Sequence, residues 1–206
     1  MIEKYINKYC EGFDFKPCEK HSEEICGITI ESESFLYSEG INRRIKSHVS
    51  FKKDGMVYEC DCADIEFPNI SLITLSDKKY LCFSRCLYGF IFLNVDTLQV
   101  EYEYFPEKVL GGEESFIVTE AKNFGEFLIF DGCYWACPYG IYAYDHSSKK
   151  FADISGEYDL IYDVEVSISE GKLILTGRNE EEKQIEISIT EKDIKDLIDI
   201  KGTLDF

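Results

Sequence analysis

The sequence has few histidines, prolines and tryptophans. Its 206 residues include three histidines, four prolines and one tryptophan. The histidines, His21, His48 and His146, lie in unrelated sequence contexts, and no P-loop, dinucleotide fingerprint or Gly-x-Ser-x-Gly elbow occurs. We therefore predict no catalytic residue and no cofactor.

Long apolar runs are also absent. No stretch reaches the roughly 18 consecutive apolar residues of a membrane span. Residues 1–8 lack the apolar segment of a signal peptide. The chain has nine cysteines, an odd number that suits free thiols in reducing cytosol better than a disulfide framework. We expect a cytoplasmic protein without membrane association, whose thiols are mostly part of the core.

Basic residues are scarce relative to acidic ones. The chain carries 22 Lys and Arg against 40 Asp and Glu, a formal net charge of -18. Residues 153–206 alone hold 15 acids and six bases. This charge repels nucleic acid and anionic membranes and attracts basic proteins, although acidity can also serve solubility alone. The expected partner is therefore another protein, of basic character.

The residues that are abundant predict strands. Hydrophobic residues make up 45% of the chain and aromatics 15%, which suits one globular domain over residues 1–206. An Asp54-Gly55 turn predicts a hairpin over 47–60. Alternating apolar and polar residues predict half-exposed strands near 164–169 and 185–189. Continuous apolar runs predict buried strands at 80–83, 90–93 and 127–130.

Two segments have helical character. Residues 2–10 are weakly amphipathic. A C-terminal helix near 190–200 is predicted by Thr190 as N-cap, followed by Ile194, Leu197 and Ile198 on one face. Both helices are expected to cover sheet edges.

Internal repetition gives the strongest indication of architecture. Tyr88-Gly and the following strand to Asn94 match Tyr139-Gly and the strand to Asp145, and a fainter copy follows. The period of about 45–50 residues is typical of four-stranded units, and the spacing resembles that of β-propeller repeats. We expect a mainly β fold of antiparallel meander units in a propeller-like arrangement, complete or incomplete, or in a sandwich, with a short C-terminal helix. The expected units lie near 25–60, 70–105, 115–153 and 163–189.

The most distinctive segment follows the strand at 127–130. It reads Asp-Gly-Cys-Tyr-Trp-Ala-Cys-Pro over 131–138 and holds the only tryptophan. Turn residues at both ends predict a loop that presents Tyr134, Trp135 and Tyr139 for binding. The motif resembles that of a group of small, acidic, uncharacterised bacterial proteins, over roughly residues 80–150. The resemblance implies no known activity.

Two classes of function remain open from the sequence. The first is a non-catalytic interaction module, for example an immunity-type inhibitor of a basic partner such as a nuclease. The second is a metal- or thiol-dependent enzyme or binding protein centred on Cys133 and Cys137. Their Cys-x3-Cys spacing matches neither the redox Cys-x2-Cys motif nor half of a common zinc set, so buried structural thiols are the favoured interpretation.

Overall fold

The computed structural model describes residues 1–105, 117–133 and 140–203. The chain divides into two compact units, which are described separately. Unit 1 comprises Met1–Ile73 and Lys78–Glu113, and unit 2 comprises Thr74–Asp77 and Glu114–Phe206. None of the described helices is long and apolar enough to span a membrane.

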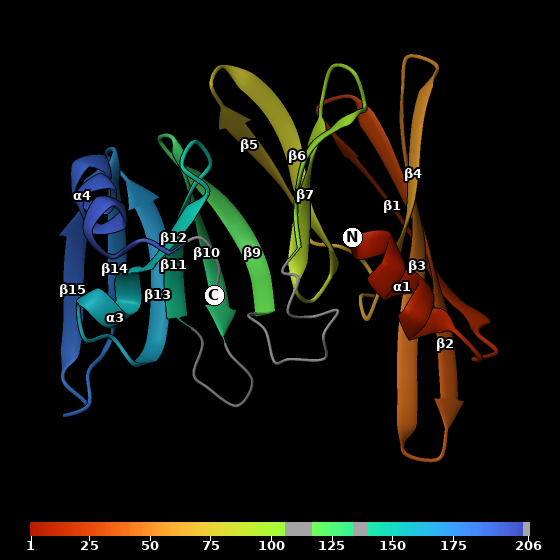
Figure 1. Ribbon diagram of the computed structural model, residues 1–206, viewed down its shortest axis with the longest axis horizontal. Helices are drawn as coiled ribbons and strands as arrows, with labels where there is room; N and C mark the ends of the chain where they lie inside the picture. The colour runs from red at the N-terminus through yellow and green to blue at the C-terminus, as the bar shows by residue number, and fades with distance from the viewer. Residues whose placement is uncertain (106–116, 134–139, 204–206) are drawn as a thin grey trace. The chain divides into compact units, whose positions relative to one another are not determined.

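The described residues of unit 1 form a helix and two four-stranded antiparallel sheets (Figure 1). Thr74–Asp77, the end of β5 and the turn to β6, is counted with unit 2. Each sheet is a meander in which strands pair in chain order. The elements are α1 (Ile2–Cys10), β1 (Lys16–Ile25), β2 (Ile28–Glu39), β3 (Asn42–Lys53), β4 (Met56–Ala63), β5 (Ile70–Leu75), β6 (Lys78–Cys86), β7 (Gly89–Asn94) and β8 (Val100–Tyr104).

The two sheets of unit 1 share one hydrophobic core. Ile30, Val49 and Phe51 of the first sheet pack against Phe83 and Ile91 of the second. The Phe51 and Phe83 rings stack with centroids 4.9 Å apart. These residues occupy one face of their strands because successive side chains alternate across a strand. Face-to-face packing of two twisted meanders follows.

The predicted hairpin over 47–60 is confirmed. Strands β3 and β4 pair up to Lys53 and Met56 and are joined by Asp54 and Gly55. These two residues have φ angles of 51° and 81°, as a two-residue hairpin turn requires.

Helix α1, also predicted, docks on unit 1 through one face. Ile2 and Ile6 are buried, one turn apart, in a small apolar cluster. The Glu3 carboxylate forms an ion pair with the guanidinium of Arg85, with Oε1 and Nη1 2.5 Å apart. Arg85 is itself buried, and its Nε donates a hydrogen bond to the carbonyl of Asp61 at 3.0 Å. Helix α1 is thus held both by apolar packing and by an ion pair.

The described residues of unit 2 form a four-stranded sheet, a three-stranded sheet and two helices, and both sheets are antiparallel meanders. Its elements are β9 (Ile117–Phe124), β10 (Phe127–Cys133), β11 (Gly140–Asp145), β12 (Lys150–Asp153), α3 (Ile154–Glu157), β13 (Tyr162–Ser169), β14 (Lys172–Arg178), β15 (Gln184–Ile189) and α4 (Glu191–Lys201).

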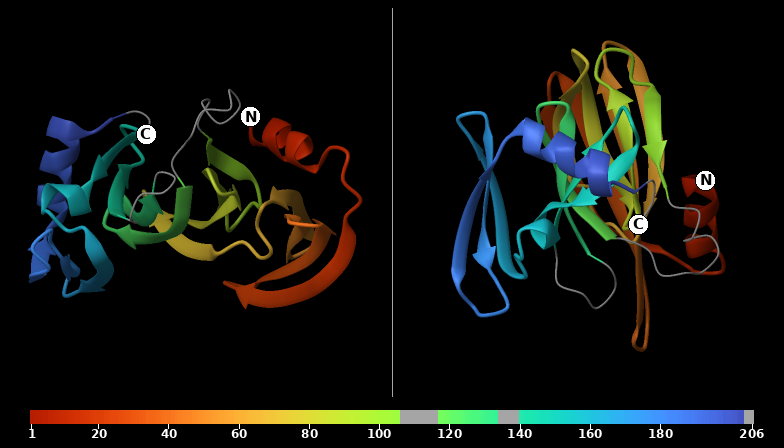
Figure 2. Two further views of the ribbon diagram at one scale, coloured as in Figure 1. Left: turned by 90° about the horizontal axis from the view of Figure 1, so that it is seen from below. Right: turned by 60° about the vertical axis from the view of Figure 1, so that its left-hand side comes forward.

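Helix α4 closes the core of unit 2. Its buried Ile194 and Ile198 join a cluster with residues of both sheets, such as Ile129 and Leu175. The helix lies against β11 and β12 (Figure 2). The predicted cap is confirmed, because the Thr190 hydroxyl accepts a hydrogen bond from the N–H of Asp193 at 3.3 Å.

Asn94 and Asp145, which occupy equivalent positions of the sequence repeat, stabilise the same kind of turn in two sheets. Each ends a strand, is buried, and accepts hydrogen bonds from backbone N–H groups two to three residues ahead. The Asn94 Oδ1 accepts from Asp96 at 2.8 Å, and the Asp145 Oδ1 accepts from Ser147 at 2.9 Å. The sequence repeat therefore corresponds to a repeated turn structure.

Asp145 makes the stability of unit 2 depend on pH. Burial opposes ionisation of its carboxyl, but hydrogen bonds from Ser147 and Ser148 outweigh this and hold its pKa below the usual 3.8. A carboxyl with a lowered folded pKa stabilises the fold above its unfolded pKa and loses that contribution as the pH falls through the folded value. We expect Asp145→Asn to be less stable at neutral pH, yet to lose less stability than the wild type below about pH 4.

Chemical denaturation at a series of pH values measures this effect. Asp159→Asn is the matched control, because Asp159 is exposed, and it should retain the wild-type pH dependence. A parallel loss of stability in Asp145→Asn and the wild type would contradict the assignment.

The fold class predicted from sequence is confirmed. The protein is mainly β, with antiparallel meander units in packed sheets and a short C-terminal helix. The four sheets span 16–63, 70–104, 117–153 and 162–189, close to the four expected units. A single domain over 1–206 stays a prediction beside the two compact units found.

Candidate functional site

The loop that the sequence analysis singled out is described only in part. Cys133 ends β10 and is buried. Tyr134, Trp135, Cys137 and Tyr139 lie outside the described residues. Their role in binding stays a prediction, as does a joint role of Cys133 and Cys137 in metal or thiol chemistry.

Most of the other thiols belong to the core, as expected. Five of the eight described cysteines are buried, and all eight are free thiols. Burial raises the pKa of Cys82 and of Cys86 to about 12, so these two remain protonated and unreactive. Cys18 and Cys26 differ because they are exposed.

The β13–β15 sheet of unit 2 turns a polar face to solvent. Glu165, Thr176 and Glu186 are paired across the three strands and form one row. Val166, Leu175 and Ile187, next in the register, turn to the core on the opposite face. Neighbouring strands lie about 4.8 Å apart, so the backbones of the two glutamates, one on each side of Thr176, are roughly twice that distance from each other.

The next row places an exposed aromatic ring on the same face. Tyr162 pairs with Arg178, and the register shift between Tyr162 and Glu165 keeps both on this side of the sheet. Tyr162 is 44% exposed. The Arg178 guanidinium lies 6.0 Å from its ring centroid and forms an ion pair with Asp163. The tyrosine is thus held in place by a cation that is already neutralised.

The turn between β14 and β15 adds further negative charge beside these rows. Residues 180–182 are three exposed glutamates. The Asn179 side chain orders the turn by accepting hydrogen bonds from the N–H groups of Glu181 and Lys183, both at 3.0 Å. We define the acidic face as Tyr162, Glu165, Thr176, Glu180, Glu182 and Glu186.

Within the described residues, no basic residue of 153–206 forms an ion pair with a carboxylate of the acidic face, although Lys172 lies on the same side of β14 as Thr176. Five of the six basic residues of 153–206 form ion pairs with carboxylates other than those of the face: Arg178, Lys183, Lys192, Lys195 and Lys201. Glu165, Glu180, Glu182 and Glu186 have no basic partner within the described parts of the chain. Four of the 15 acidic residues of 153–206 therefore lie together on this face without a basic partner among the described residues.

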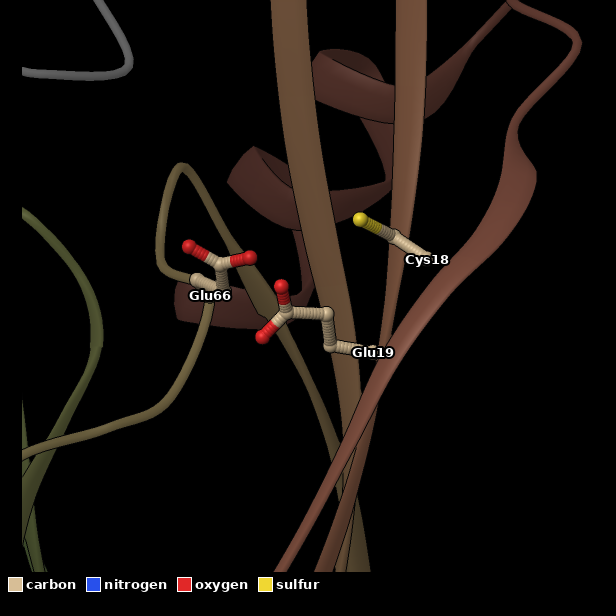
Figure 3. A group of neighbouring side chains, drawn as sticks. All are labelled: Cys18, Glu19 and Glu66. Carbon is tan, nitrogen blue, oxygen red and sulfur yellow. The ribbon is translucent and has the colours of Figure 1, made fainter.

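Unit 1 contains a different group of polar side chains. The thiol of Cys18 and the carboxylates of Glu19 and Glu66 offer three ligand atoms that lie within 4.8 Å of one another. Figure 3 shows the three side chains pointing toward a common space, two from β1 and one from the segment after β4. Within the described residues, these three side chains form the cluster of potential ligands that is close enough to hold a metal ion.

A β-bulge explains why the adjacent residues Cys18 and Glu19 contribute to one group of side chains. Neighbouring strand residues normally point to opposite faces. Here the register shifts between Pro17 and Lys20, so that Cys18 and Glu19 both oppose Ser34 of β2. The buried Ser34 hydroxyl accepts from the N–H of Glu19 at 3.1 Å and donates to its carbonyl at 3.3 Å. The bulge is therefore held from within the sheet.

A second buried serine holds the segment that carries Glu66. Ser47 of β3 pairs with Ser34 in the register. Its hydroxyl donates a hydrogen bond to the carbonyl of Ile65 at 3.0 Å. Two serines of one row thus anchor the two chain segments of the group.

Neither the acidic face nor the group of Cys18, Glu19 and Glu66 was predicted from the sequence. Glu165 and Glu186 stood out only as polar positions of alternating strands. Glu19 and Glu66 lie far apart in sequence, and no ligand spacing joins them. Comparisons of the chain with protein-family models, with curated proteins and with solved structures find no match. Its function must be inferred from the chemistry of its own residues.

Proposed function

We propose that the protein is a non-catalytic binding module that docks a basic protein partner on the acidic face. The observation that carries this is the row Glu165-Thr176-Glu186, two exposed carboxylates of one sheet face without basic partners in the described chain. A field of one sign steers an oppositely charged partner and raises its association rate.

The rest of the acidic face has the properties of a contact surface. The next row of the face places Ile174 between Ser167 and Ser188, so an apolar side chain lies beside the charged row and could contact a partner. Tyr162 provides an exposed aromatic side chain of the type enriched among residues that dominate binding energy. Charge would bring the partner in, and the ring would anchor it.

The chemistry suggests a class of partner. Enzymes that act on nucleic acid present cationic surfaces to phosphates, and such a surface is complementary to two spaced carboxylates and an acidic turn. An immunity-type inhibitor of a basic nuclease-like protein is therefore the specific form of the proposal. The alternative centred on Cys133 and Cys137 gains no support here, because Cys133 is buried.

The test is capture of a partner from the lysate of the native host, followed by titration of the purified pair. We expect Glu165→Gln/Glu186→Gln to weaken binding at least about tenfold, and salt to weaken the wild-type complex. The control Glu24→Gln/Glu59→Gln removes the same charge from exposed positions of unit 1 and should bind as the wild type does. Equal binding by both double variants would contradict the proposal.

Trp135→Ala tests the sequence-based loop prediction on the same titration. Loss of binding in this variant but not in Glu165→Gln/Glu186→Gln would move the interface to the 131–139 loop.

A further inference from the structure

We propose that Cys18, Glu19 and Glu66 of unit 1 bind a zinc ion, with water completing the coordination. This site is separate from the acidic face, and it uses none of the cysteines singled out in the sequence. The donor set of the group, its electrostatics and a buried hydroxyl on the same sheet face favour a bound metal ion.

The donor set selects the metal. Thiolate and carboxylate ligands bind zinc at about 2.3 Å and 2.0–2.2 Å, so donors of one tetrahedral zinc ion lie about 3.5 Å apart. The three ligand atoms already lie within 4.8 Å of one another, and small side-chain rotations would close the remaining gap. Calcium and magnesium prefer sets of oxygen ligands only, so the thiol favours a borderline ion such as zinc.

The electrostatics of the group call for a cation. Glu19 and Glu66 bring two carboxylates close together, and no Lys, Arg or His pairs with either one within 1–105, 117–133 and 140–203. The two nearest ion pairs along β1 and β2 leave them untouched, since Lys20 pairs with Glu33 and Lys52 with Glu31. Like charges at this distance repel each other, and a divalent ion between them reverses the sign of the interaction.

A buried hydroxyl lies on the sheet face that the segment carrying Glu66 crosses. Ser32 lies on the face of β2 that carries Ser34, in the adjoining row between His21 and Val49. The segment 65–67 passes over this face, because Ser47 bonds to Ile65 and the His21 and Phe67 rings are 5.1 Å apart. Ser32 is 6% exposed, and its Oγ has no hydrogen-bond partner among the described residues.

An unsatisfied buried hydroxyl costs free energy and calls for a partner. A water molecule bound to the metal would supply one, and the hydroxyl would hold that water in place, as outer-shell groups do in metal sites. Ser32, in this account, is a positioning residue and not a ligand. Three protein ligands with one water form the arrangement of an open zinc site.

Cobalt(II) provides the direct probe, because a cobalt–thiolate bond gives a charge-transfer absorption band that zinc removes on displacement. We expect the purified full chain to bind one equivalent of Co²⁺ with this band, and zinc to displace it. Cys18→Ser should abolish the band, and Glu66→Gln should weaken metal affinity by at least about tenfold. Cys18 is exposed and Glu66 is partly exposed, so the fold, checked by circular dichroism, should persist.

Cys26→Ser is the matched control, since Cys26 is an exposed cysteine at the β1–β2 turn outside the group. It should bind cobalt as the wild type does. The proposal is overturned by the absence of a thiolate band, by its loss in Cys26→Ser instead of Cys18→Ser, or by unchanged affinity in Glu66→Gln. Ser32→Ala should weaken affinity less than Glu66→Gln while leaving the band in place.

Discussion

Replacing Phe51 with alanine should lower the free energy of unfolding of unit 1 by about 3–5 kcal/mol. Phe51 lies on the interior strand β3 and is 0% exposed. Its ring stacks on Phe83 at 4.9 Å and contacts Tyr58 at 5.8 Å. Removal of the ring loses its burial and leaves a cavity between two sheets that cannot collapse freely.

Chemical denaturation of the full chain measures this loss, with near-ultraviolet circular dichroism reporting on the aromatic core. Val57→Ala is the control, because Val57 lies on the adjacent β4 and is 56% exposed. It should change stability by no more than about 0.5 kcal/mol. A similar cost for both substitutions would mean that the two sheets do not share the core described above.

The second large effect is expected at a residue that looks unimportant. Glu3 is mostly exposed, but it provides the ion pair for the buried guanidinium of Arg85. The Arg85 Nη2 already has no hydrogen-bond partner among the described residues, so loss of Glu3 would leave the charge poorly compensated. We expect Glu3→Ala to cost about 2–3 kcal/mol, more than a helix-surface substitution normally does.

Two further variants separate charge compensation from helix propensity. Lys4→Ala changes the adjacent exposed residue of α1 and should have little effect. Arg85→Met removes the buried charge itself and should cost less than Glu3→Ala, because an apolar side chain needs no partner. Denaturation midpoints for the three variants provide the comparison. Equal effects of Glu3→Ala and Lys4→Ala would show that the ion pair contributes nothing.

The elements that the sequence predicted correctly are those with local signals. Asp54-Gly55 can adopt the positive φ angles of a hairpin turn without help from distant residues. Thr190 and the apolar residues after it form a capped amphipathic helix from a stretch of ten residues or so. The alternation around Glu165 and Glu186 revealed two strands for the same reason.

Features without a signal in the local sequence were not predictable. Strand β1 is almost entirely exposed and has no apolar alternation, and it is a strand because it pairs with β2. The group of Cys18, Glu19 and Glu66 requires a bulge and a folded-back segment, neither of which leaves a sequence signal. The acidic face needed the register of three strands before two separate glutamates could be placed in one row.

The location of the interface tests the proposed function most directly. Hydrogen–deuterium exchange of the full chain, alone and with its captured partner, reports which backbone segments become protected. We expect protection concentrated in 162–169 and 172–189, with the first sheet of unit 1 unchanged. Protection confined to other segments, with β13–β15 exchanging as in the free protein, would contradict the assignment of the acidic face.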